Sequence, residues 1–100
     1  MNMKKQEQIL VRVKGHGDSK QRTFSNALSQ VQKEVLKNTN NILLRIEPID
    51  IQVVSAIEKI VMERFLFIFL PRKKTFYEIT LDVSVNVTFI DLNDIEFTSK

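Results

Sequence analysis

The chain has 100 residues, no cysteine, 43% hydrophobic residues and a formal net charge of +3. This length makes one ordinary domain, 1–100, that can bury its own core. Without cysteine there is no disulfide framework and no thiolate metal site. The longest apolar run, residues 65–70, is far shorter than the roughly 20 residues of a membrane-spanning helix. The polar start, without an apolar segment, predicts no secretory signal. We therefore expect a soluble domain with flexible ends at 1–6 and 98–100, in the cytoplasm or peripheral to the membrane.

Charge is distributed unevenly along the chain. Residues 1–41 carry eight basic and three acidic side chains, whereas residues 76–98 carry five acidic and no basic ones. The simpler interpretation is that two elements expose solvated faces of opposite sign, and electrostatic self-assembly is the alternative.

The first predicted element is a strand over roughly residues 7–14, where Ile9, Val11 and Val13 alternate with other residues. It ends at the only two glycines, Gly15 and Gly17. Because glycine tolerates left-handed backbone conformations, the pair predicts a sharp connection. The segment matches neither the dinucleotide-binding nor the Walker pattern, so it is only a weak phosphate-loop signal.

An amphipathic helix follows, to about Lys37. Asp18 or Ser19 provides an N-cap, with Gln21 three residues after Asp18. Apolar residues then recur at helical spacing and predict a buried stripe: Phe24, Ala27, Leu28, Val31 and Val35. The polar residues 38–41 end the helix.

The second predicted strand opens at Ile42. Its apolar residues are even-numbered before Pro48 and odd-numbered after it. Because successive residues of a strand face opposite sides, this change predicts a bulge or kink there. Because proline lacks an amide donor, this strand is an edge strand or is bent at that point. Residues 55–63 fit a continuing strand better than a short helix, and both interpretations stay open.

A long strand over residues 76–90 organises the fold. Apolar and polar residues alternate along it without a break, which predicts one buried and one solvated face. After it, residues 91–94 predict a turn and residues 95–97 a short strand or a tail.

A hydrophobic arm is predicted before this strand. Residues 65–70 are apolar at both even-numbered and odd-numbered positions. Such a strand is either covered on both faces or forms an exposed sticky surface, and residues 71–74 close a hairpin. We predict a partner surface that comprises Phe65, Phe67, Phe69, Arg72, Lys73 and Lys74. Its basic tip either contacts anionic lipid or nucleic acid, or only protects the arm from aggregation.

The sequence provides no catalytic constellation. His16 is the only histidine, and no serine lies in a recognisable nucleophile motif. Glu78 and Asp82 share a strand face but lie about 13 Å apart, too far for paired acid and base chemistry in that register. We therefore predict that the protein is not an enzyme and has no catalytic residue, metal or cofactor. Nucleic acid is a disfavoured partner, because the aromatic residues Phe65, Phe67 and Phe69 do not alternate with lysines and the overall charge is low.

The predicted fold is α+β, with the order β-α-β-β(-β), in which one helix packs on an antiparallel sheet of three or four long strands. One helix cannot cover all the apolar surface of such a sheet. The pattern therefore favours a homo-oligomer, or insertion into a larger complex.

The sequence resembles two known protein families. Through GHGDSKQRTFSNALSQVQ, LLRIEP, ERFLFIFLPR and LDVSVNVT, most of the chain resembles a small bacterial family catalogued as domain of unknown function 4312. This resemblance implies genes encoded beside membrane proteins and sugar-acid metabolic enzymes, and thus an accessory subunit of a membrane or metabolic assembly. At the level of pattern only, residues 9–54 and 77–89 are similar to the dodecins, flavin-storing proteins that form hollow shells. Dodecins stack flavin on a tryptophan, which this chain lacks.

Three functions follow, in order of preference. The first is a non-catalytic oligomeric accessory subunit that acts by protein–protein association. The second is a dodecin-like oligomer that binds a small ligand, and the third is a basic-loop binder of anionic lipid or nucleic acid.

Overall fold

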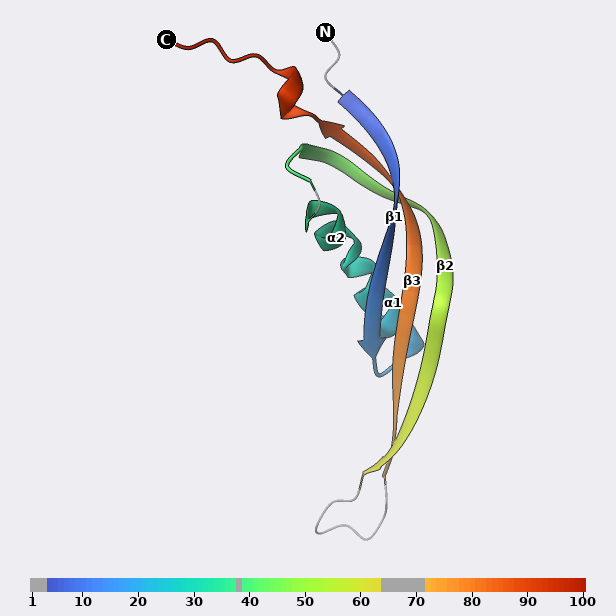
Figure 1. Ribbon diagram of the computed structural model, residues 1–100. Helices are drawn as coiled ribbons and strands as arrows, with labels where there is room; N and C mark the ends of the chain where they lie inside the picture. Colours follow the sequence, from blue (N-terminus) through green and yellow to red (C-terminus); the bar gives the residue numbers. More distant parts are fainter. Residues whose placement is uncertain (1–3, 38, 64–71) are drawn as a thin grey trace.

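A computed structural model describes residues 4–37, 39–63 and 72–100. The elements in chain order are β1 (Lys4–Gly17), α1 (Lys20–Ser29), α2 (Val31–Lys37), β2 (Ile42–Glu63), β3 (Arg72–Ile90) and the short 3-10 helix η1 (Leu92–Asp94). The three strands form one antiparallel sheet in the order β1-β3-β2, and the helices lie against one of its faces (Figure 1). This architecture confirms the predicted α+β class, with three strands among the described residues.

Strand β3 is the centre of the sheet and of the core. Its odd-numbered residues 79–87 are buried against the helices, whereas the even-numbered residues between them are only partly buried on the opposite face. Leu81, Val83 and Val85 are completely buried. The alternation in the sequence therefore marks a buried face and a more exposed face, as predicted. The strand begins four residues earlier than predicted.

The two glycines have a different role from the predicted one. Gly15 and Gly17 both lie within β1, and no described residue has a positive φ. A Cβ atom at Gly15 would lie 2.4 Å from the Thr23 carbonyl oxygen and 2.5 Å from the Ala27 nitrogen. The glycines therefore allow α1 to approach the strand closely, and the predicted left-handed connection is wrong.

The helical segment consists of two helices. Ser19 caps α1, and its hydroxyl oxygen accepts a hydrogen bond from the Arg22 amide at 3.2 Å. Gln30 interrupts the segment, and its amide donates to the carbonyl oxygens of Ala27 and Leu28. The predicted single helix is therefore divided at this residue.

The buried stripe of the helices is rotated from the predicted one. Thr23, Ala27, Val31 and Val35 are buried, at intervals of four residues. Phe24, which was expected in the core, is 38% exposed. Because the close approach at Gly15 leaves space only for small side chains such as Thr23 and Ala27, the larger Phe24 lies on the flank.

Strand β2 runs without interruption through residues 55–63, so the strand interpretation of this segment is confirmed. After β3 the chain makes the single turn of η1, close to the predicted turn at 91–94, and residues 95–100 belong to no strand. The ammonium of Lys5 binds Asp94 at 2.6 Å and Asp91 at 3.7 Å, which ties this end to β1. Hydrogen bonding to Asp94 raises the pKa of Lys5.

The molecule is far more extended than its length requires. Its radius of gyration is 20.6 Å and its extents are 76 × 32 × 15 Å, whereas a compact domain of this length has a radius of gyration of about 13 Å. The cause is visible in Figure 1, where β2 and β3 continue well past the helices.

Candidate interaction surface

The surface of interest is the side of β2 that faces the helical layer. Residues directly opposite one another on antiparallel strands share a face. Ile51 lies opposite Val83, and Val53 lies opposite Leu81, both of which face the helices. The same register defines what we call the inner face of β2: Leu43, Ile46, Pro48, Ile51, Val53 and Ala56.

Three bulges keep this inner face apolar. The pairing with β3 shifts between Leu43 and Arg45, between Pro48 and Asp50, and between Val53 and Ser55. Each bulge adds one residue, so even-numbered and odd-numbered side chains exchange faces of the sheet. The next apolar residue therefore again lies on the helical side. The bulge predicted beside Pro48 is confirmed, and the other two were not predicted.

The helices leave most of the inner face uncovered. Helix α1 packs on β1 and β3, and α2 packs on β1. Ile51 is therefore 40% exposed and Val53 is 54% exposed, although the residues opposite them on β3 are completely buried. Leu43 and Ile46 are partly buried against the core. The uncovered part of the sheet is thus an apolar strip along the middle of β2.

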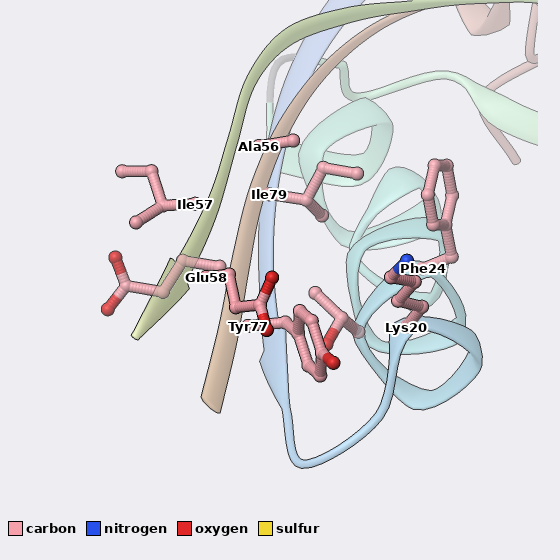
Figure 2. Close-up of a pocket in the computed structure, with 9 residues that line it drawn as sticks. Lys20, Phe24, Ala56, Ile57, Glu58, Tyr77 and Ile79 are labelled. Atoms are coloured by element: carbon pink, nitrogen blue, oxygen red, sulfur yellow. The ribbon is translucent and has the colours of Figure 1, made fainter. Parts of the chain in front are cut away.

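A groove of about 230 Å³ lies between α1 and the β2–β3 pair. Figure 2 shows Phe24 and Lys20 on its helical side and Ile79, Tyr77 and Ala56 on its sheet side. Its lining is predominantly apolar.

Besides Glu78, which pairs with Lys59, the groove carries two opposite charges on different elements. Lys20 comes from the start of α1, and Glu58 comes from β2, where it lies opposite Tyr77 on the helical side of the sheet. Among the described residues, neither side chain has an ion-pair partner. Both charges are therefore available to a molecule that enters the groove.

The opposite, outer face of the sheet carries ion pairs between strands beside exposed apolar side chains, such as Leu10 opposite Ser84 and Ile57 opposite Glu78. Arg12 on β1 donates two hydrogen bonds to the Asp82 carboxylate, at 2.7 and 3.1 Å. Hydrogen bonding from Arg12 holds the pKa of Asp82 below its ordinary value. The Lys59 ammonium donates to Glu78 at 3.2 Å across β2 and β3. These two pairs neutralise charges on the outer face, whereas Lys20 and Glu58 at the groove have no ion-pair partner among the described residues.

The structure bears on only part of the predicted partner surface. Phe65, Phe67 and Phe69 lie outside the described residues. Arg72, Lys73 and Lys74 form the start of β3, where they lie opposite Glu63, Met62 and Val61.

Residues 72–74 are thus strand residues, and their assignment to a hairpin turn is wrong. A strand extends to them because β2 continues through residue 63 and offers backbone partners. The Lys74 ammonium lies 5.4 Å from the centre of the Phe76 ring. This is a cation–π distance, so the ammonium lies beside β3.

His16, the one histidine, lies exposed on β1, and its backbone amide donates to the Asn26 side-chain oxygen at 3.1 Å. Within residues 4–37, 39–63 and 72–100, no group of three or more His, Cys, Asp or Glu side chains could hold a metal ion. Neither α1 nor α2 has the length and apolarity needed to cross a membrane.

Sequence reasoning did not identify the exposed inner face of β2. The switches between even-numbered and odd-numbered apolar residues in this segment were a signal. Such a switch indicates a bulge, but it does not show which face of the strand another element covers. The decisive fact is that the helices lie over β1 and β3, which depends on the strand order β1-β3-β2.

Comparison with known protein families gives a match over most of the chain. The family model described as "Domain of unknown function (DUF4312)" matches residues 7–90, which include all three strands in large part and both helices. No curated protein and no solved structure gives a significant match.

Proposed function

We propose that this chain, which belongs to the DUF4312 family, acts by association, as a non-catalytic oligomeric subunit. In this proposal the oligomer is an accessory component of a bacterial membrane-associated or metabolic assembly. The observation that carries the proposal is the uncovered apolar surface of β2, because such a surface is costly to leave in water.

The amount of exposed surface supports association. The accessible surface of the chain is 8190 Å², whereas a monomeric protein of 11.7 kDa has about 5,900 Å². The excess of about 2,300 Å² per chain is larger than the roughly 800 Å² that each partner buries in a standard interface. The chain therefore has enough extra surface for a stable contact.

The position of the apolar side chains supports the same proposal. Ten of the large hydrophobic side chains that are more than about a third exposed belong to β2. No fully buried residue of the core comes from this strand. Of these ten, Ile51, Val53, Ile60 and Met62 lie on the helical side of the sheet, and in our proposal another molecule covers side chains of this side.

The mass of the purified protein in solution tests the proposal. We expect analytical ultracentrifugation and native mass spectrometry to give a multiple of 11.7 kDa at micromolar concentration. A single-copy molecule that stays monodisperse at high concentration would overturn the proposal.

A second candidate function is the binding of a small ligand by the oligomer, as the dodecin-like pattern implies. The groove between α1 and β2 favours it, because an apolar lining with two aromatic side chains, Phe24 and Tyr77, is typical of small-molecule sites. A coloured or ultraviolet-absorbing compound that co-purifies and is released on unfolding would support this candidate. A colourless protein whose mass equals that of the chains alone would count against it.

The third candidate, binding of anionic lipid or nucleic acid, depends on the cations at the start of β3. Lys73 and Lys74 are both exposed there. Affinity of this kind falls steeply with ionic strength, so binding to anionic vesicles or to nucleic acid that is unaffected by salt would eliminate it.

A further inference from the structure

The free edge of β2 is poorly suited to continue the sheet into another chain. Pro48 provides no amide donor on this strand, and the three bulges interrupt the regular spacing of the backbone groups. Proline and bulges are both devices by which edge strands avoid pairing with other edges. Pairing at the edge would also leave Ile51 and Val53 uncovered, because their side chains lie on a face of the sheet.

The same chain carries an apolar ridge that could cover this face. Phe24 and Leu28 lie one turn apart on α1 and are 38% and 36% exposed. Phe24 and Ala56 both line the groove between α1 and the β2–β3 pair, and Leu28 follows Phe24 by one helical turn, so the ridge borders this groove. An exposed ridge and an uncovered strip thus lie next to each other on one side of the molecule.

A two-fold arrangement of two copies would cover both surfaces at once. In such a contact, if a residue i of one copy touches residue j of the other, j also touches i. The α1 ridge of each copy would lie on the inner face of the other copy's β2. In this contact we expect Lys20 of each copy to pair with Glu58 of the other, since neither charge has an ion-pair partner among the described residues of its own chain. A different protein would have to supply this complementary ridge and charge independently.

From these observations we propose that a second copy of this chain docks face-on upon the inner face of β2 through its α1 ridge, and does not extend the sheet edge to edge. This inference rests on the proposed function and specifies the geometry of the contact. The excess surface of about 2,300 Å² per chain is of the size that obligate homodimers bury.

Cysteine cross-linking tests the geometry directly, because the natural chain has no cysteine. Two differently tagged chains, one carrying Leu28→Cys and the other Val53→Cys, are co-expressed, purified and treated with a short bismaleimide. The matched control replaces Val53→Cys by Gln52→Cys, its neighbour on the polar face, opposite Asp82. We expect a strong mixed product with Val53→Cys and at least a fivefold lower yield with Gln52→Cys.

Each other outcome has a definite meaning. Equal mixed yields from the two β2 variants, or self-linked Gln52→Cys chains, would overturn the face-on contact and indicate edge pairing. Absence of any mixed product, in a protein whose mass is that of an oligomer, would also overturn it and leave the proposed function standing. A monomeric unmodified protein would overturn both.

A charge substitution provides a second measurement that needs no cross-linker. Val53 and Gln52 are both exposed in the single chain, so neither Val53→Asp nor Gln52→Asp disturbs its core. We expect Val53→Asp to weaken self-association at least tenfold and Gln52→Asp to leave it within twofold of the unmodified protein. Equal effects of the two substitutions would contradict face-on docking.

Discussion

Replacement of Gly15 by alanine should destabilise the fold through the contact between β1 and α1. The new Cβ would lie 2.4 Å from the Thr23 oxygen, 2.5 Å from the Ala27 nitrogen and 2.7 Å from the Ala27 Cβ. The first two atoms belong to the backbone, so the whole helix must move by about 1 Å to restore ordinary contacts of about 3.5 Å.

The size of the effect follows from two opposing terms. Overpacking of this kind costs about 1–3 kcal/mol, and the higher values apply here because no flexible side chain can move aside. The lower entropy of the unfolded alanine chain offsets about 0.4–1 kcal/mol of this cost. The net loss of about 2 kcal/mol should lower the melting temperature by roughly 8–16 °C.

Gly17 provides the matched control, since its added Cβ would meet Thr23 atoms at 3.0 Å and Arg22 Cβ at 3.2 Å. These shortfalls are only a few tenths of an ångström, so Gly17→Ala should cost less than about 1 kcal/mol. Urea and thermal unfolding followed by circular dichroism, at one fixed protein concentration, measure both variants. If Gly15→Ala proves as stable as Gly17→Ala, the close approach of α1 to β1 is not what requires glycine.

Three further predictions concern charge and the partner surface predicted from the sequence. Because Arg12 lowers the pKa of Asp82, the ion pair stabilises the fold above the ordinary aspartate pKa of about 3.9 and loses this effect as the pH falls through the lowered value. Urea unfolding of the unmodified protein and of Asp82→Asn should therefore differ at neutral pH and converge in strong acid; a constant difference would contradict the assignment. If the phenylalanine arm is a partner surface, Phe67→Asp should reduce the mass of the oligomer, whereas a folded protein of unchanged mass would remove the arm from the interface. If lipid binding is a function, Lys73→Glu with Lys74→Glu should abolish sedimentation with anionic vesicles at low salt, and undiminished sedimentation would exclude these cations as the contact.

The central strand could be predicted from the sequence because a single periodicity determines it. Along residues 76–90 the apolar residues alternate without a break, and a period of two has one structural meaning. The bulge at Pro48 was predictable for a related reason. The apolar residues switch from even-numbered to odd-numbered positions beside a proline, which has no amide hydrogen to donate to a neighbouring strand. The bulges after Leu43 and Val53 lie in segments where both parities are apolar, so periodicity carried no information there.

The rotation of the helix and the role of the glycines could not be predicted from local patterns. Phe24 and Ala27 both fit an apolar stripe, and which of them is buried depends on how closely the helix approaches the sheet. That distance is determined by Gly15, on another element. A glycine pair between a strand and a helix has a turn as its usual local meaning, and only the tertiary contact shows otherwise.

The far end of the β2–β3 pair provides a further way to observe the proposed association. Strand β1 ends opposite Tyr77, while β2 and β3 remain paired as far as Glu63 and Arg72. Over residues 59–63 and 72–76 the sheet is therefore a two-stranded ribbon, and such a ribbon is barely stable in water by itself. Its amide protons should exchange quickly in a single chain. If the proposed association also covers the ribbon, deuterium uptake there should fall as the protein concentration rises, without any label.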